Sequence, residues 1–207
     1  MTAYLVQPLG KTMLYALYPY KKTDILSIDW TSENYDLLDQ EGWLDTQSVQ
    51  LKFNLKAGKT PAALSRYDII FHLGYLIVSQ KVKTLLQPEA ERRWVQFLDI
   101  TINGHGVSDD FFALHATNHE HATDFARSVY EKTGFDGCEE YEFDVQQLKD
   151  AFDWDVSIAA DADYPTQTIV SSDLCRRLMQ AGLKNTVRFY HRIDNRDAEQ
   201  SIWLASE

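Results

Sequence analysis

The densest group of metal-ligating side chains in this sequence lies between positions 105 and 124: His105, His115, His119, Glu120, His121 and Asp124. His115 and His119 are four residues apart, so a helix would place both on one face, as metal-binding helices do. His119 and His121 would instead share one face of a strand. The segment lacks the His-Glu-x-x-His pattern, and its glycine and asparagine residues favour turns over one rigid helix. We therefore expect structural histidines and predict no metal or other cofactor.

No side chain stands out as a catalytic nucleophile. Cys138 follows Gly137 and precedes two glutamates, which disfavour a thiolate, and Cys175 falls within a predicted helix as a core residue. The sequence contains neither Gly-x-Ser-x-Gly nor Gly-x-Gly-x-x-Gly, the patterns of a hydrolase elbow and of a dinucleotide site. We predict no catalytic residue of this kind.

Two further motifs are weak on the same grounds. Gly58-Lys59-Thr60 is like the end of a phosphate-binding loop, but the earlier glycine is missing and Pro61 argues against a helix that follows. The paired aspartates within 153–155 and 161–163 are of the types that act as acid and base in a glycosidase. Spacing alone does not bring two carboxylates to one bond, so we do not expect that activity.

The charge of the chain is strongly acidic and unevenly distributed. The 207 residues carry a formal net charge of -11. Seven acidic residues and no basic one lie between Asp24 and Asp45, and ten acidic residues accompany only Lys149 between Asp136 and Asp163. A nucleic-acid binder must present lysine and arginine to phosphates, so a cationic protein partner is favoured over nucleic acid. The plain alternative is a solvated acidic face that keeps the protein soluble.

Length and cysteine content place the chain among ordinary intracellular proteins. A chain of 207 residues is long enough to bury a core without disulfides, and no linker divides it, so we expect a single domain over residues 1–207. The two cysteines fit no metal spacing, and the sequence has no secretory segment and no apolar run long enough to cross a bilayer. We therefore predict a cytoplasmic protein without membrane contact.

The hydrophobic pattern predicts an α+β fold, with a mainly antiparallel sheet and a few short helices. We expect helices within 80–87, 123–133, 144–152 and 172–181, and the loop-like acidic segment 153–164. Residues 123–133 could also form a bent strand. Expected strands are 4–6, 13–20, 49–55, 68–78, 94–102, 111–116, 141–143, 187–189 and 202–204, and Asn103-Gly104 predicts a hairpin turn.

One stretch of this pattern occurs twice. Ile77 to Phe97 and Ile169 to Phe189 align without a gap at an offset of 92 residues (169 − 77), with six identities in 21 positions. Each copy has a β-branched pair, then a serine suited to cap a helix (Ser79 and Ser171), then an amphipathic stretch and a second strand. The expected unit is strand, capped helix, strand. It predicts an internal repeat, although short capped helices share this pattern without common origin.

The second copy also resembles a known family. Residues Thr168 to Leu183, followed by Val187-Arg188-Phe189, are similar to the C-terminal signature of a bacterial family first described as a domain of unknown function and later assigned to immunity proteins of polymorphic toxin systems. Similar residues lie upstream at Val78-Ser79, Phe97, Phe111 to Leu114, Asp124 and Arg127-Ser128. The resemblance covers roughly residues 70–189, and the N-terminal third lies outside it.

The resemblance implies an antidote protein, of the kind found in contact-dependent growth inhibition and related systems, that binds and neutralises a cognate toxin domain and catalyses nothing. The acidic balance suits a nuclease toxin with a basic cleft. Candidate partner-binding residues are then Glu139, Glu140, Asp153, Trp154, Asp155, Asp161 and Asp163, with Trp43 and the segment 24–45 as a second candidate surface. Two alternatives stay open: a metal-dependent hydrolase that uses His105, His115, His119 and His121, and an acidic adaptor protein.

Overall fold

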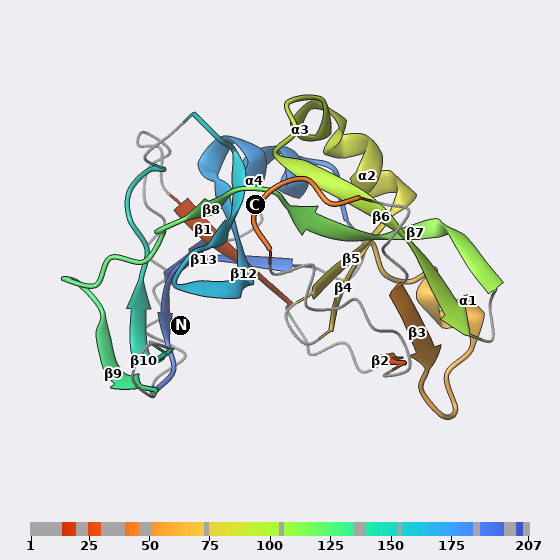
Figure 1. Cartoon of the computed structure of the whole chain (residues 1–207), viewed down its shortest axis with the longest axis horizontal. Helices are drawn as coiled ribbons and strands as arrows, with labels where there is room; N and C mark the ends of the chain where they lie inside the picture. The colour runs from red at the N-terminus through yellow and green to blue at the C-terminus, as the bar shows by residue number, and fades with distance from the viewer. Residues whose placement is uncertain are drawn as a thin grey trace, which may run out of the picture.

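The chain folds into two sheets joined by a shared core and short helices. In the computed structural model, the described residues are 14–19, 25–29, 40–45, 51–72, 75–103, 106–134, 140–152, 155–183, 187–196 and 202–204. They form two mostly antiparallel sheets and four short helices (Figure 1), which confirms the predicted α+β class. No helix within these described ranges is long and apolar enough to cross a bilayer.

The larger sheet has eight strands in the order β8-β11-β12-β1-β13-β10-β9, with β14 paired to β13. Only β8 and β11 are parallel. The strands are β1 (Leu14–Pro19), β8 (His119–Glu120), β9 (Val129–Thr133), β10 (Glu140–Gln147), β11 (Ile158–Asp161), β12 (Tyr164–Ser171), β13 (Val187–Asp194) and β14 (Ile202–Leu204).

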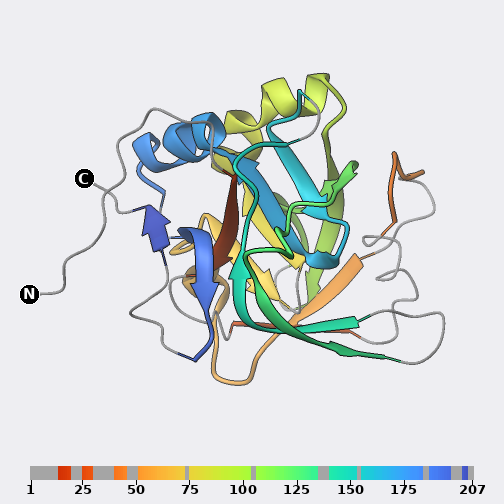
Figure 2. The ribbon, with the colours of Figure 1, turned by 90° about the vertical axis from the view of Figure 1, so that its left-hand side faces the viewer.

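The smaller sheet has six strands in the order β2-β3-β6-β7-β5-β4, with only β3 and β6 parallel. Its strands are β2 (Leu26–Ile28), β3 (Leu51–Leu55), β4 (Ile69–His72), β5 (Tyr75–Ser79), β6 (Val95–Asn103) and β7 (Gly106–Ala116). The helices are α1 (Pro61–Leu64), α2 (Gln80–Leu85), α3 (Gln87–Glu91) and α4 (Ser172–Gln180). Helices α2, α3 and α4 lie together along one end of the two sheets (Figure 2).

Both predicted helix caps are confirmed, and they have the same geometry. Ser79 and Ser171 are extended, and their hydroxyls accept from the backbone N–H of Val82 at 3.5 Å and of Leu174 at 3.3 Å. The backbone N–H of each serine donates at 2.8 Å to the residue that precedes the neighbouring strand, to Asp68 O before β4 and to Ser157 O before β11. Each serine therefore ends a strand and begins a helix at one sharp corner.

The strand register extends the similarity of the two copies. In the smaller sheet β7 lies between β5 and β6, and Ala113 is opposite both Ile77 and Leu98. In the larger sheet β1 lies between β12 and β13, and Ala16 is opposite both Ile169 and Tyr190. These two residues are 92 positions after Ile77 and Leu98, so they are their equivalents in the second copy. The two central strands also read alike, Phe111-Phe112-Ala113-Leu114 and Leu14-Tyr15-Ala16-Leu17. The repeat is thus structural, with the central strand supplied after the first copy and before the second.

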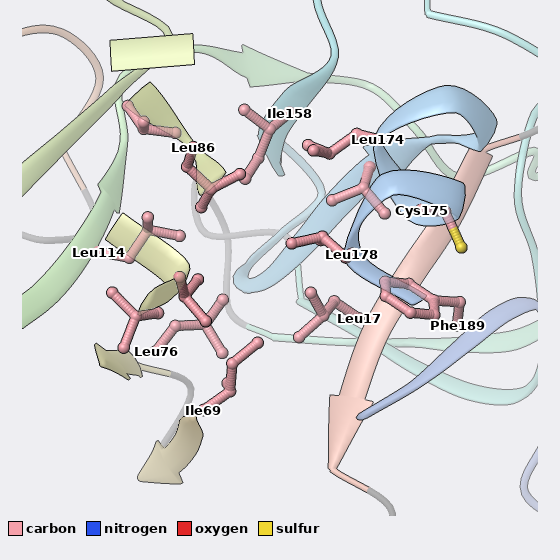
Figure 3. Packing of buried hydrophobic residues seen from close by; sticks show 14 of the residues in the cluster. Leu17, Ile69, Leu76, Leu86, Leu114, Ile158, Leu174, Cys175, Leu178 and Phe189 are labelled. Atoms are coloured by element: carbon pink, nitrogen blue, oxygen red, sulfur yellow. The ribbon is translucent and has the colours of Figure 1, made fainter. Parts of the chain in front are cut away.

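Equivalent residues of the two copies meet in the central core. This core lies between the sheets and beneath α2 and α4 (Figure 3). The register and the offset of 92 pair its members as Ile69 with Ile158, Val78 with Val170, Val82 with Leu174, Leu86 with Leu178, Phe112 with Tyr15, and Leu114 with Leu17. Neither copy could bury this face alone, because each supplies only one side of the layer.

The outer faces of the two sheets are covered differently. On the outer face of the smaller sheet, Ile77 and Ala113 belong to a large apolar cluster that also contains Leu26 of β2, Phe53 of β3 and Leu64 of α1. The equivalent face of the larger sheet, with Ile169 and Ala16, has a smaller apolar cluster that also contains Leu14, Ala122 and Leu148. Buried polar side chains, such as Asp161 and Gln146, lie beside that cluster.

Several predicted strands are confirmed and one is corrected. The hairpin at Asn103-Gly104, the strand at 202–204 and the burial of Cys175 agree with expectation, and the strand at 4–6 lies outside the described residues. The apolar run 68–78 is not one strand but the hairpin β4-β5, in which His72 is opposite Tyr75. Both of its strands face apolar cores on two sides, so a continuous apolar run could not reveal the reversal.

The region after residue 120 departs most from expectation. The helix expected at 123–133 is a turn followed by the strand β9, closer to the bent-strand alternative. The expected capping box at Asp144 lies inside strand β10, and the acidic segment 153–164 contains strand β11. Strand pairing with distant β13 and β12 overrides these local helix and loop signals.

Pro61 begins α1, because proline at a first helical position loses no hydrogen bond.

The shared core predicts that its two halves lose stability together. We expect Leu86→Ala and the equivalent Leu178→Ala each to lower the free energy of unfolding by about 2–5 kcal/mol, because each leaves a cavity in the central layer. Val129→Ala, at a side chain that is 47% exposed, is the control and should change it by well under 1 kcal/mol. Urea unfolding followed by fluorescence should give one transition in every variant. Two separate transitions would show that the sheets unfold independently.

Candidate functional site

The structure does not bring the described histidines together. His115 is buried in β7, where its Nε2 donates to Gly42 O at 2.7 Å. His119 lies in the short strand β8, and His121 is exposed, with its Nδ1 3.1 Å from both oxygens of Asp163. Within the described part of the chain no group of three ligand side chains could hold a metal ion. His105 lies outside the described residues.

The acidic residues predicted from the sequence to bind a partner separate into exposed and buried ones. Glu140 begins β10 and is exposed, as is Asp155. Asp163 is partly exposed and accepts from His121, whereas Asp161 has no exposed surface. Three others, Glu139, Asp153 and Trp154, lie outside the described residues, as do residues 24 and 30–39 of the segment 24–45. A side chain without exposed surface cannot touch a partner directly, so Asp161 belongs to the interior.

Asp161 is the centre of a buried polar network inside the larger sheet. Its Oδ2 accepts from Thr123 Oγ1 at 2.8 Å, and its Oδ1 accepts from the backbone N–H of Asp163 at 3.1 Å. Gln146 Nε2 donates to Thr123 Oγ1 at 2.8 Å, and Gln146 and Gln167 exchange two amide hydrogen bonds of 2.9 and 3.0 Å. The network joins β10, β11 and β12, so it fixes how the sheet curls around its small apolar cluster.

Burial dominates the titration of this carboxyl. Loss of water raises the pKa of Asp161 from its usual value to about 6, and the hydrogen bonds from Thr123, Asp163 and Ala122 oppose that rise. At neutral pH the side chain is therefore mostly ionised, and it depends on those donors.

A cavity of about 390 Å³ opens next to this network. Gln146 belongs to both, because its amide joins the network and it also lines the cavity. The wall residues come from β10, β12 and β13: Tyr141, Glu142, Phe143, Asp144, Gln146, Tyr164, Ile193 and Asn195. Tyr164 is 43% exposed, and the carboxylate of Asp144 is paired with the guanidinium of Arg196. The cavity thus combines an apolar wall with carboxylates.

The β9-β10 hairpin carries different side chains on its two faces. Tyr130 is opposite Phe143 and Lys132 is opposite Tyr141, while Glu131 is opposite Glu142. Because strand side chains alternate, the aromatic residues share one face and the two glutamates share the other with Glu140. We call the set Glu131, Glu140 and Glu142 the acidic face of the hairpin. All three side chains are exposed.

Aromatic contacts stiffen the opposite face. The rings of Phe125, Tyr130, Tyr141 and Phe143 all lie within 4.8 to 6.2 Å of one another, measured between centroids, in tilted or edge-to-face arrangements. Such pairs contribute about 0.5–1.5 kcal/mol each beyond the area that they bury. Phe125 belongs to the turn before β9, so this cluster ties the hairpin to its own connection and holds it in one shape.

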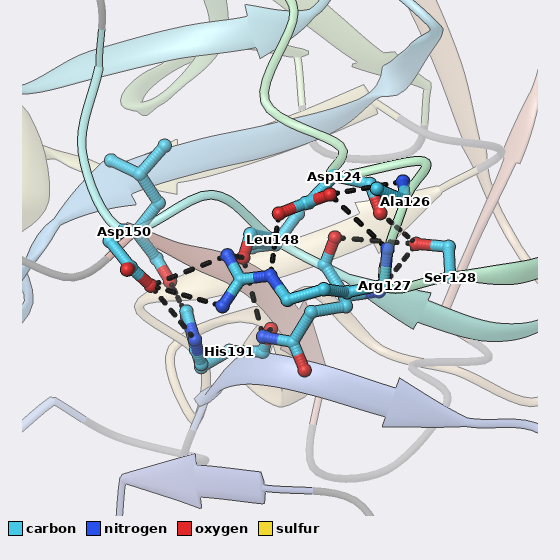
Figure 4. A network of polar contacts seen from close by, with 9 residues as sticks. Asp124, Ala126, Arg127, Ser128, Leu148, Asp150 and His191 are labelled. Carbon is cyan, nitrogen blue, oxygen red and sulfur yellow. Dashed lines mark hydrogen bonds and ion pairs between the residues drawn. The ribbon is translucent and has the colours of Figure 1, made fainter.

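Arg127 anchors the same turn to the sheet (Figure 4). Its Nε donates to Asp124 Oδ2 at 2.5 Å, and its Nη2 donates to Leu148 O at 3.2 Å and contacts Asp150 at 3.4 Å. Burial works to raise the pKa of Asp124, but the hydrogen bonds and charge of Arg127 outweigh it and lower the pKa. Nearby, burial lowers the pKa of His191, whose Nδ1 donates to Leu14 O at 3.0 Å.

The thiol of Cys175 has a structural role. It is fully buried in the central core on α4, and burial raises its pKa well above the usual range. A thiol in that state is a poor nucleophile.

Of the acidic face and the cavity wall, the candidate residues predicted from the sequence include only Glu140, and they omit Glu131, Glu142 and Tyr164 among others. The alternation of glutamate and aromatic residues in Glu140-Tyr141-Glu142-Phe143 predicts a two-faced strand, and it was available in the sequence. Nothing local indicates that Glu131 lies opposite Glu142, because that follows only from the pairing of β9 with β10.

The buried carboxyl predicts a pH dependence with a definite sign. Between pH 4 and pH 6 the folded chain holds a proton on Asp161 that the unfolded chain releases, so this group stabilises the fold at low pH and the contribution is lost as pH rises through about 6. Asp161→Asn should remove that loss. Urea unfolding at pH 4 and pH 7.5 should therefore show the variant gaining about 2–3 kcal/mol relative to the wild type at the higher pH. A constant difference at the two pH values would contradict a raised pKa.

The anchor of the turn predicts a local effect on stability. Arg127→Lys keeps the charge but loses the forked donors, so we expect a loss of about 1 kcal/mol in unfolding free energy. Exchange of the Asp124 amide, which donates to Gln147 O, should become faster. Arg176→Lys is the control, because Arg176 only pairs with the exposed Asp173 one helical turn away, and it should cost less than about 0.5 kcal/mol. Equal effects of the two variants would argue against an anchoring role.

Known proteins add no assignment to this geometry. Neither the protein-family models nor the curated proteins compared with this sequence match it.

Proposed function

We propose that this protein is an immunity protein, which binds a cognate bacterial toxin domain directly and so neutralises it. The observation that carries the proposal is the concentration of exposed carboxylates on the β10 side of the larger sheet. Glu131, Glu140 and Glu142 are all exposed there. The stretch from Asp136 to Asp163 has ten acidic residues and one basic residue. Such a surface attracts a basic partner and repels nucleic acid.

The resemblance to immunity proteins supports the proposal through residues with structural roles. Asp124, Arg127 and Ser128 hold the turn before β9, and Ser171 caps α4. Residues of this kind specify a fold, so a likeness in them is a likeness in architecture. The contact surface of an immunity protein is complementary in shape and charge to its own toxin. The residues that contact the toxin are therefore expected on the exposed surface and not among these structural residues.

The physical mechanism is competition for a basic cleft. A nuclease must hold phosphates with lysine and arginine side chains, and an acidic protein surface can occupy the same groups. A stable complex of this kind would bury about 1,200–2,000 Å² in total. Because the attraction is electrostatic, association should be fast at low ionic strength and slower as salt is added.

Co-expression tests the proposed function. The chain is expressed with the toxin domain encoded immediately upstream of its gene, and growth and co-purification are scored. We expect growth to be restored and both chains to elute as one complex, with an association rate that falls at least tenfold between about 20 and 300 mM salt. A catalytically inactive toxin variant provides the control for expression. Growth arrest without a complex would contradict neutralisation by direct binding.

A further inference from the structure

We propose that the acidic face of the β9-β10 hairpin and the adjoining cavity form the site that receives a lysine or arginine side chain from a basic segment of the partner protein. This assignment rests on the proposed function only in taking the partner to be a toxin. The site itself requires no more than a basic polypeptide. Three observations carry it: a like-charge pair, a cavity beside that pair, and a rigid support behind both.

The like-charge pair is Glu131 and Glu142. They are directly opposite each other on neighbouring strands, where Cβ atoms lie about 5 Å apart and like charges are destabilising. Lys132 is the only basic residue of β9 and β10. It is opposite Tyr141, so its position belongs to the aromatic face and not to the acidic face. Glu140, two residues before Glu142, adds a third carboxylate to the acidic face. The free protein is therefore left with a repulsion that a bound cation would remove.

The cavity lies where a cation attracted to this face can bury its stem. Glu142 belongs to both the acidic face and the cavity wall. Ile193 and the half-exposed ring of Tyr164 supply apolar surface for the methylene groups of a long side chain, while Gln146 and Asn195 supply polar groups. A volume of about 390 Å³ accommodates one such side chain together with some water.

The walls of the site are held by contacts within the protein itself. The aromatic cluster holds the hairpin in one shape, with Tyr141 and Phe143 also in the cavity wall, and the carboxylate of Asp144 is paired with Arg196. Gln146 is held by Thr123 and Gln167. A site with fixed walls binds without the entropy loss of ordering them. The exposed glutamates of the acidic face are thus the groups that can bind a cationic side chain of a partner.

A basic polypeptide fits better than a metal ion or a nucleic acid. The described residues contain no group of three ligands that could hold a metal, and phosphates would be repelled by the three glutamates. A guanidinium or ammonium group on an apolar stem matches both the carboxylates and the Tyr164 wall.

The first measurement is the thermal stability of the free protein. Glu142→Lys replaces the repulsion with an attraction across the hairpin, so Tm should rise by about 1–4 °C. Glu91→Lys, at an exposed position of α3 on the helical end of the molecule, is the matched charge reversal and should leave Tm within about 1 °C. A Tm for Glu142→Lys that is unchanged or lower would overturn the argument from the like-charge pair.

The second measurement is binding of a defined basic probe. The ¹⁵N-labelled chain is titrated with a hexa-arginine peptide, and amide shifts and the Kd are recorded. We expect the shifts to concentrate at residues 129–133, 140–146 and 164, and the Kd to weaken at least tenfold in the double variant E131Q/E142Q. E91Q should weaken it less than twofold. Shifts spread evenly over the acidic surface, or equal weakening in E91Q, would overturn the proposed site.

The same variants with the toxin domain separate this inference from the proposed function. Binding of toxin that weakens at least tenfold in E131Q/E142Q but not in E91Q supports the site as the toxin contact. Equal binding to wild type and E131Q/E142Q overturns the site while it leaves neutralisation intact. Toxin that does not bind the wild-type protein contradicts the proposed function, and the peptide titration then decides the site alone.

Discussion

The apolar layer between the two sheets is the interaction on which the rest of this structure depends. Residues at equivalent positions of the two halves belong to this one layer, such as Leu114 and Leu17 or Leu86 and Leu178. A capped corner at Ser79 or Ser171 sets the angle at which each helix leaves its strand and closes over the layer. Because each half supplies one side of this layer, the inner face of either sheet is buried only against the other sheet.

With that layer fixed, the outer faces were free to diverge. In the smaller sheet the outer face carries a large apolar cluster, to which β2, β3 and α1 contribute. The second copy instead encloses Asp161, Gln146 and Gln167 in a hydrogen-bonded network beside a cavity. A buried polar network is stable only when its members are satisfied, and this one is tied to three strands. The two halves thus share the inner face that stabilises the fold, and they differ on their outer faces, where a partner could bind.

The hairpin at the edge of the larger sheet shows how stability and binding oppose each other. Its aromatic face packs internally, while Glu131 and Glu142 repel across the strands. An edge strand that bears charge also resists pairing with other chains, so the glutamates protect β9 as well. The same charges that destabilise the free hairpin attract a basic partner, because a bound cation would relieve their repulsion.

The sequence by itself determined the locally encoded features. These were the α+β class, the two serine-capped helices α2 and α4, the hairpin formed by β6 and β7, and the acidic balance. They depend on residues close together in the chain, so propensity and periodicity suffice. Tertiary structure alone decided that the run 68–78 reverses, that 129–133 and 144–147 form strands, that Asp161 is buried and that Glu131 lies opposite Glu142. Each of these is set by pairing or packing with a distant segment, and no local pattern contains its partner.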